Sequence, residues 1–332
     1  MRIRAFRVVA LIVAALLWST AARSEGPSWA ARSTWPDSLL IGTASPGGTY
    51  YVYGAGLAKI LTRALGIPVA SIPTEGPNQN ILLLESGEAK IGFVTMGIAE
   101  QAWSGAAWTG GKQYRAMRAI FPMYDTPFQF MVLQGSGIQS VSQLAGKRVG
   151  IGPQAGTAGT YVPNFFKVLK IEAPLRTGEW AALAAQVGSG GLDALAVAAG
   201  VPFPSFAELE ARNRVRYLPL TTDQISALRT AMPELTPSAV PAGSYPSLLR
   251  TYATVGLYNF AVAHEDLPDD LIYRLVKAVF ENQDEMMEVH PAAASTVPAN
   301  VSRNAFLPFH PGARRYYREI GVALPLGLGE TD

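Results

Sequence analysis

The chain has 332 residues, of which 49% are hydrophobic and 16% are charged. This composition excludes an intrinsically disordered chain, and the length suits two globular domains better than one. Cysteine is absent, which excludes disulfides and thiol chemistry. No cluster of Lys and Arg suggests binding to nucleic acid.

The first 22 residues have the pattern of a secretory signal peptide. Three arginines precede an apolar stretch over residues 8–18, and small residues follow up to Ala22. The apolar stretch is too short for a helix that spans a membrane. Its removal would leave 24 of the 27 basic residues against 25 acidic ones, a net charge of about −1. We therefore expect a periplasmic protein with a linker over residues 23–37.

Residues 39–66 form the unit around which the rest is organised. A short apolar strand over 39–41 leads into a glycine loop, and apolar residues at helical spacing follow until Gly66. The helix thus begins at the carboxyl end of the strand, where free N–H groups and the helix dipole attract anions. The alternative is that these glycines only form a tight turn.

Two more units with the same order of strand, loop and helix follow. They comprise strands over 69–72 and 89–94 and helices over 81–86 and 98–103. Such alternation predicts an α/β fold with a mostly parallel sheet and helices on both faces. Ligands of these sheets lie beyond the carboxyl ends of the strands, so we expect Thr49, Asn78 and Thr95 to lie close together.

A second glycine loop follows the strand predicted over 148–151. It ends in the string GTY at 159–161, which repeats the GTY at 48–50 of the first loop. Each string stands where a helix should begin. We therefore predict two similar α/β lobes that each direct one helix N-terminus toward a common cleft.

The remaining pattern suggests how the lobes are joined. Further strands are predicted over 128–133, 194–198, 215–220 and 254–263, a short helix within 137–147, and later helices over 267–282 and 311–320. We expect the strands over 128–133 and 254–263 to cross between the lobes. Residues 38–126 and 264–332 would then form lobe 1, and residues 127–263 lobe 2.

Motifs of common enzymes are missing. The sequence has no G-x-S-x-G, H-E-x-x-H or P-loop pattern, and its three histidines stand beside turn or helix-start signals. The string Gly150-x-Gly152-x-x-x-Gly156 resembles a dinucleotide-binding fingerprint. However, Pro174 argues against a strand that would present Glu172 to a ribose. We expect no cofactor, no metal and no enzymatic activity.

Five segments, in order, resemble one protein family. They are IGTASPGGTYYVYGAGLAKIL, NILLLESGEAKIGFVT, LAGKRVGIGPQAGTAGT, LDALAVAAGVPFPSFAELE and LPFHPGARRYYREIG. From about Leu40 to Glu319 the chain resembles a TAXI-type solute receptor of the tripartite ATP-independent periplasmic (TRAP) transporters. At 156–159 it has Gly-Thr-Ala-Gly, whereas many members carry Gly-Ser-Gly, so the identity of the ligand does not carry over.

This resemblance implies a fold and a function. The fold is a type II-like periplasmic binding protein with two α/β lobes, each a mostly parallel sheet flanked by helices, joined by crossing hinge strands. The function is to close on a small carboxylate or amino acid and deliver it to a membrane permease driven by an ion gradient. The alternative is a secreted enzyme on the same scaffold.

Candidate ligand-binding residues come from the loops expected at the cleft. They are Gly48, Thr49, Tyr50, Tyr51, Glu75, Asn78, Thr95, Met96, Gln154, Thr157, Gly159, Thr160, Tyr161, Pro202 and Phe203. Asn78, Asn80 and Thr95 also suit helix caps. For the ammonium group of an amino acid, the acidic candidates are Glu75 and Asp125, which equally suit ordinary loop positions. Because these loops contain no arginine, we expect helix N-termini to hold a carboxylate.

Overall fold

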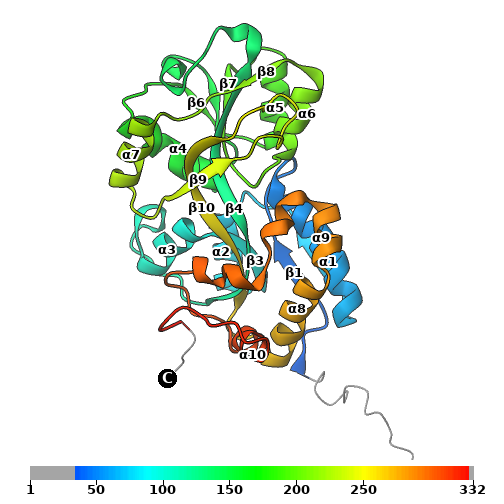
Figure 1. The fold of residues 1–332 in the computed structure, drawn as a ribbon. Helices are drawn as coiled ribbons and strands as arrows, with labels where there is room; N and C mark the ends of the chain where they lie inside the picture. The colour runs from blue at the N-terminus through cyan, green and yellow to red at the C-terminus, as the bar shows by residue number, and fades with distance from the viewer. Residues whose placement is uncertain (1–33, 329–332) are drawn as a thin grey trace, which may run out of the picture. The chain divides into compact units, whose positions relative to one another are not determined.

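The computed structural model describes residues 34–328, so the predicted signal peptide and most of the predicted linker lie outside the described residues. From Trp35 onward the chain forms two lobes in which helices cover strands (Figure 1). No helix in this part of the chain is long and apolar enough to cross a membrane.

The sheet of the first lobe has the order β2-β1-β3-β10-β4. Its strands are β1 (Leu39–Gly42), β2 (Val69–Ile72), β3 (Ile91–Thr95), β4 (Met117–Leu133) and β10 (Tyr252–His264). Strand β1 pairs in parallel with β2 and β3, whereas β10 runs antiparallel to β3 and β4. The three short strands therefore end at the same edge, as the strand–loop–helix rhythm predicts.

The second lobe continues the sheet in the order β4-β7-β5-β6. Its strands are β5 (Val149–Gly150), β6 (Leu175–Arg176), β7 (Ala194–Ala198), β8 (Val215–Tyr217) and β9 (Thr236–Val240). Strand β5 is parallel to β6 and β7, while β4 is antiparallel to β7 and β8. Each lobe thus combines three parallel strands with long antiparallel ones.

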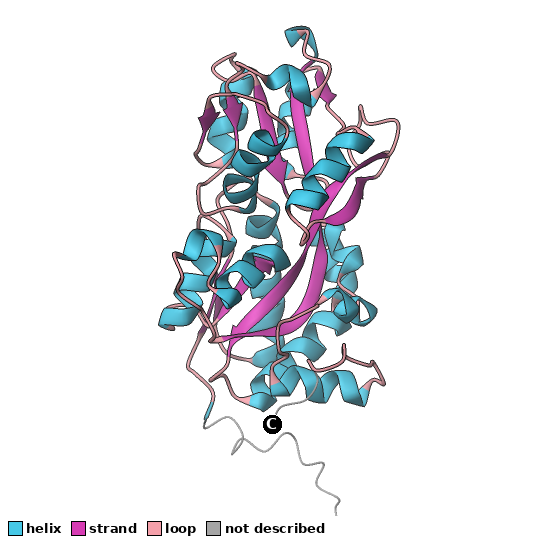
Figure 2. Ribbon diagram, turned by 90° about the vertical axis from the view of Figure 1, so that its left-hand side faces the viewer, coloured by secondary structure: helices cyan, strands magenta, loops and turns pink. Residues whose placement is uncertain are grey.

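Strands β4 and β10 run through both lobes (Figure 2). Strand β4 pairs with β10 as far as Pro127 and with β7 from Phe128 onward. Strand β10 pairs with β9 over its first residues and then with β4 and β3. The strand predicted over 128–133 is therefore only the second part of β4, which begins at Met117.

Helices cover the sheet in both lobes. Those of the first lobe are α1 (Thr49–Leu65), α2 (Pro77–Ser86), α3 (Met96–Ser104), α8 (Asp269–Glu281), α9 (Gln283–Val289) and α10 (Pro311–Glu319). Those of the second lobe are α4 (Thr157–Val168), α5 (Trp180–Gly188), α6 (Pro204–Arg212) and α7 (Thr222–Ala231). Helices α5, α6, α7 and α9 were not predicted, since each is short and adds little helical periodicity to the sequence.

Helix α1 shows why the first loop folds as it does. Gly47 has φ +82°, which favours glycine, and Gly48 is extended at the N-cap. The helix buries the predicted apolar face that includes Leu57 and Leu61. It ends at Gly66 in the left-handed conformation, whose N–H donates to the carbonyl oxygen of Thr62. Both predicted ends of this helix are confirmed.

Two predicted helices differ from the structure. The helix predicted over 81–86 begins earlier, at Pro77, because proline suits the first helical position where no N–H is needed. The helix expected within 137–147 is only a 3-10 turn, Val141–Leu144. Thr95 is the N-cap residue of α3, as predicted, although its side chain makes no capping hydrogen bond. The prediction of Asn78 and Asn80 as helix caps is wrong, because both lie inside α2, whose N-cap is Gly76.

Candidate functional site

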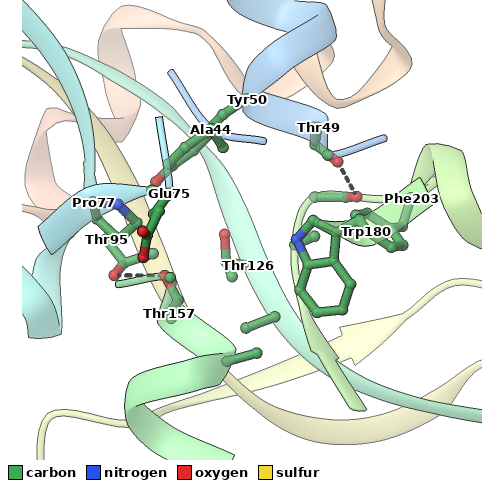
Figure 3. A pocket seen from close by; sticks show the side chains of 17 residues that line it. Ala44, Thr49, Tyr50, Glu75, Pro77, Thr95, Thr126, Thr157, Trp180 and Phe203 are labelled. Atoms are coloured by element: carbon green, nitrogen blue, oxygen red, sulfur yellow. Dashed lines mark hydrogen bonds between the residues drawn. The ribbon is translucent and has the colours of Figure 1, made fainter. Parts of the chain in front are cut away.

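A small cavity lies between the lobes, beyond the carboxyl ends of the parallel strands (Figure 3). Its volume of about 40 Å³ is enough for roughly three or four water molecules. We call it the cleft cavity. It is lined by Ala44, Gly48, Thr49, Tyr50, Glu75, Gly76, Pro77, Thr95, Thr126, Gly156, Thr157, Ala158, Trp180, Ala198, Ala199, Gly200 and Phe203.

Helices α1 to α6 all begin at the wall of the cleft cavity. Their N-caps or first-turn residues are among its lining, in contrast to the two helix N-termini that the sequence predicts. Among the described residues, no side chain caps any of these six helices. Helix α7, which begins elsewhere, has a complete capping box between Thr221 and Gln224. No side chain therefore occupies these helix ends, although the N–H groups of Asn78 in α2 and Ser205 in α6 donate to backbone carbonyl oxygens of the opposite lobe, at Ala155 and Gly47.

Backbone N–H groups of α1 and α4 are available in the cavity. In the described structure, the N–H groups of Thr49, Tyr50, Thr157 and Ala158 donate to no protein acceptor. Unpaired N–H groups at a helix start, together with the positive end of its dipole, favour an anion. Glu75 is the one charged side chain among the described lining residues, so the other polar groups of the wall are neutral and come from both backbone and side chains.

Four threonine hydroxyl groups of the lining differ in what they offer a ligand. Thr49 donates its hydroxyl hydrogen to the carbonyl oxygen of Gly200 at 2.9 Å, which leaves it as an acceptor. The hydroxyl oxygens of Thr95 and Thr157 are 3.3 Å apart, so one of the two keeps a free hydrogen. Thr126 already accepts a hydrogen bond from Asn259 and can donate to a ligand.

Asn259 binds two of the side chains that line the cavity. It is fully buried at a register shift of β10, between Tyr258 and Phe260. Its Oδ1 accepts from the hydroxyl of Tyr50 at 2.6 Å. Its Nδ2 donates to the hydroxyl of Thr126 at 2.5 Å. One amide thus orients two lining side chains from different elements.

The two lobes touch across the cavity. The carboxylate of Glu75 accepts from the N–H of Ala155 at 3.2 Å. On another side, the hydroxyl of Ser205 donates to the carbonyl oxygen of Gly47 at 2.9 Å. The backbones also approach closely, since a Cβ at Gly76 would lie 3.0 Å from the Cα of Gly156. The structure is therefore a closed form in which both lobes contribute to one site.

Seven of the predicted site residues line the cavity. They are Gly48, Thr49, Tyr50, Glu75, Thr95, Thr157 and Phe203. They come from both lobes, and the expected proximity of Thr49 and Thr95 is confirmed. Asn78 lies just behind the wall, where its N–H donates to the carbonyl oxygen of Ala155 across the lobes. Contact with a ligand remains a prediction for all of them.

Several predicted residues of the second loop point elsewhere. A Cβ at Gly159 would lie 2.3 Å from the carbonyl oxygen of Pro153, so this glycine serves the packing of its own loop. Thr160 donates to the carbonyl oxygen of Gly156 one turn back. Tyr161 is buried against Phe128 and Phe165, and its hydroxyl accepts from Gln101 and donates to Glu234 outside the cavity. The repeated GTY string therefore does not give equivalent side chains to the site.

The other predicted residues are also outside the cavity. Tyr51 is 39% exposed on α1, since it follows Tyr50 by one residue and points to another face of the helix. Met96 lines a separate surface hollow with Glu234, and Gln154 lies in an outer groove with Glu75. Pro202 uses its carbonyl oxygen to accept from the Nε2–H of His290 at 2.9 Å.

Asp125, the other acidic candidate for an ammonium partner, is not at the cavity. It is buried against β9, where it accepts from the hydroxyl of Ser238. Burial raises the pKa of the Asp125 carboxyl group. Glu75 is therefore the acidic residue that remains near a bound ligand.

The three histidines have a common structural role. In each case Nδ1 accepts from the backbone N–H two residues further on, at Asp266, Ala292 and Gly312. Burial lowers the pKa of His310 to about 4, so this ring is neutral at pH 7. Among the described residues, no group of three or more His, Cys, Asp or Glu side chains could hold a metal ion.

The glycines at 150, 152 and 156, which resemble a dinucleotide fingerprint, have a structural role. A Cβ at Gly150 would lie 2.8 Å from the side chain of Leu195, and one at Gly152 would lie 2.1 Å from the ring of Trp180. Gly156 approaches the backbone of the other lobe at Glu75. These glycines provide room for packing and for the contact between lobes, which explains the spacing without a dinucleotide.

Trp180 and Thr126 are lining residues that sequence analysis missed. Trp180 is the first residue of α5, and α5 follows β6 as α1 follows β1. The same strand–loop–helix rule points to this position, but the two-residue strand β6 leaves almost no periodic signal. Thr126 lies within β4 and could not be distinguished from other strand residues.

Two solved structures share this fold. An ancestral arginine-binding protein bound to arginine has 15% sequence identity and a TM-score of 0.50, covering 77% of this chain and 97% of that one. PhnD1 from Prochlorococcus marinus, in complex with methylphosphonate, has 14% identity and a TM-score of 0.53, covering 87% and 100%. The fold is that of a two-lobed periplasmic binding protein. The chain belongs to the NMT1-like family, whose model matches residues 41–321.

Proposed function

We propose that this protein is a periplasmic solute-binding protein that captures a small organic anion or amino acid between its lobes. The observation that carries the proposal is the convergence of six helix N-termini on one closed cavity, where the first N–H groups of α1 and α4 have no protein acceptor among the described residues. Backbone N–H groups without protein acceptors stabilise negative charge without an arginine or lysine. The family membership and the shared fold support the same function.

The size and charge of the cavity define the class of ligand. Its volume of about 40 Å³ in the closed form favours a compact molecule with few heavy atoms. The free N–H groups of α1 and α4 suit a carboxylate. Glu75 at the rim is the candidate partner for an ammonium group, so a simple acid and an amino acid are both consistent with the lining.

A thermal-shift comparison of acids with their amides tests the anion site. We expect acetate, propionate, pyruvate, L-alanine or L-glutamate to stabilise the mature protein by about 2.7 kcal/mol at roughly 100 times the dissociation constant. For lobes of this size the melting temperature would rise by about 5 to 10 °C. The primary amide of the same ligand lacks the charge and should lose most of this shift. Equal stabilisation by acid and amide would contradict the proposal.

The protein is proposed to bind its ligand without chemical change. No motif for a nucleophile, a metal or a cofactor appears in the sequence, and helix N-termini supply binding rather than a catalytic base. After overnight incubation with the protein, the bound acid should be recovered intact by mass spectrometry. A product that forms only in the presence of the protein would favour the alternative, an enzyme on the same scaffold.

A TRAP-type permease is the proposed membrane partner. The resemblance of five ordered segments to TAXI-type receptors supports this assignment. In vesicles that contain the permease, uptake of labelled ligand should require the added binding protein and an ion gradient. An ionophore should stop this uptake, whereas removal of ATP should not. Uptake that follows ATP hydrolysis instead would point to a permease of another class.

A further inference from the structure

Trp180 is held rigidly at the wall of the cleft cavity. Its side chain is 7% exposed, and its ring packs edge-on against Phe203 with a centroid distance of 5.2 Å. On another side it fills the space left by Gly152, where any Cβ would lie 2.1 Å from the ring. The φ of +73° at Gly152 further favours glycine there. The indole therefore has one well-defined position.

The indole N–H of Trp180 has no protein acceptor in the described part of the chain. Figure 3 shows the nitrogen directed toward the middle of the cavity, on the side of Thr126. The nitrogen is not one of the fully buried atoms that lack a partner, so its N–H group is accessible from the cavity although most of the ring is buried. The indole can only donate, so a ligand that pairs with it must supply an acceptor atom.

We infer that Trp180 determines ligand specificity by donating its indole N–H to an anionic oxygen of the bound ligand. This inference rests on the proposed function, because it concerns the same anion. One carboxylate oxygen would lie at the helix starts of α1 and α4, and the other would accept from the indole. A ligand that presents an amino group toward Trp180 is excluded, since two donors would face each other.

The position of Trp180 also links recognition to closure. Trp180 belongs to the second lobe, whereas Thr49 and Tyr50 of α1 belong to the first. A single anion can contact both sets of donors only when the lobes are together. The hydrogen bond from the indole to the ligand therefore stabilises the closed form, and a stronger bond stabilises it more.

The test is the variant Trp180→Phe, with Trp108→Phe as its matched control. Phenylalanine keeps an aromatic ring beside Phe203, but it removes the indole N–H donor together with part of the ring that packs on Gly152. Trp108 also has an indole nitrogen without a partner in the described structure, but it stacks on Tyr114 away from the cavity. Acetate, propionate, pyruvate, L-alanine and L-glutamate are the probes, and calorimetry gives each dissociation constant.

We expect Trp180→Phe to weaken the tightest probe about 10- to 100-fold, the effect of losing one hydrogen bond to a charged group. Trp108→Phe should bind like the parent. In ¹H–¹⁵N spectra of the parent, the indole signal that is absent from Trp180→Phe should move downfield on binding. This second measurement separates a hydrogen bond from a loss of packing.

The outcomes distinguish the two proposals. If the parent binds none of the five probes, the proposed function itself is contradicted. If the parent binds but Trp180→Phe binds equally well, the role of Trp180 is wrong and the anion site stands. Weaker binding by the variant without movement of the indole signal in the parent also overturns the inference, since altered packing would then explain the loss.

Discussion

Gly156→Val is expected to reduce ligand binding by more than 100-fold while the protein remains folded. Gly156 has an extended backbone with φ −92°, which any residue can adopt, although a Cβ there would also lie 3.1 Å from the carbonyl oxygen of Pro153 in the same loop. In the closed form, a Cβ at Gly156 would lie 3.3 Å from the carbonyl oxygen of Glu75 in the other lobe. The larger side chain of valine cannot fit there unless the lobes move apart.

Separated lobes would no longer share one ligand. The hydrogen bond between Glu75 and Ala155 and the contact between Thr95 and Thr157 both lie beside this point. If closure is prevented, the N–H groups of α1 and α4 cannot reach the same anion. The ligand then keeps only the contacts that one lobe provides. A 100-fold effect requires the closed state to lose about 2.7 kcal/mol, and we expect the two methyl groups of valine, attached to a Cβ that is already tight, to supply it.

Calorimetry with the tightest of the five probes measures this loss, and thermal unfolding without ligand measures stability. Gly135→Val is the matched control, because a Cβ at Gly135 has no atom within 4 Å and its φ is not positive. Gly135→Val should bind like the parent. Undiminished binding by Gly156→Val would show that closure does not require the glycine contact between lobes.

Asn80→Leu is expected to cause the largest loss of stability, about 3 to 5 kcal/mol. Asn80 is 1% exposed within α2, behind the cavity wall. Its Nδ2 donates to the carbonyl oxygens of Thr43 and Phe93, both at 2.8 Å, and its Oδ1 accepts from the hydroxyl of Thr74 at 2.7 Å. One amide therefore joins the ends of β1 and β3 to the loop before α2.

Leucine has a similar volume but leaves these three buried polar groups without the partners they have now. Each unsatisfied buried group costs about 1 to 3 kcal/mol, and the costs add only in part because the groups are neighbours. Urea unfolding gives the free energy of unfolding for each variant. As a control, Asn164→Leu changes an exposed residue of α4 and should shift this free energy by only about 0.5 kcal/mol. Equal effects at both positions would contradict the role of Asn80.

Local order along the chain was largely predictable from the sequence. The alternation of strands, glycine loops and helices gave the parallel units of both lobes, and the glycines at 48 and 66 marked the ends of α1. Helices α5, α6, α7 and α9 were not predicted, and each has only 7 to 10 residues, too few for a long periodic pattern. The carboxyl ends of the strands also indicated where a ligand would bind, since that edge is shared by all strands of a parallel sheet.

Which side chains reach the cavity was decided only by tertiary structure. Thr49 and Thr160 stand in the same three-residue string, yet Thr49 lines the cavity and Thr160 does not. Helix α4 begins at Thr157, three residues before Thr160, whereas α1 begins at Thr49 itself. A shift of three residues along a helix changes both the position of a side chain along the helix axis and the direction in which it points. The local sequence does not show where a helix starts relative to the opposite lobe.

The same reason applies to Trp180 and Asn259. Trp180 faces the cavity because Gly152 and Phe203, distant in sequence, fix its ring. Asn259 reaches Tyr50 and Thr126 because a register shift in β10 directs it inward. The sequence by itself determined the strand–loop–helix units and the edge at which they open. Long-range packing determined which donors meet there, because contacts between residues far apart in the chain set the orientation of each helix and strand.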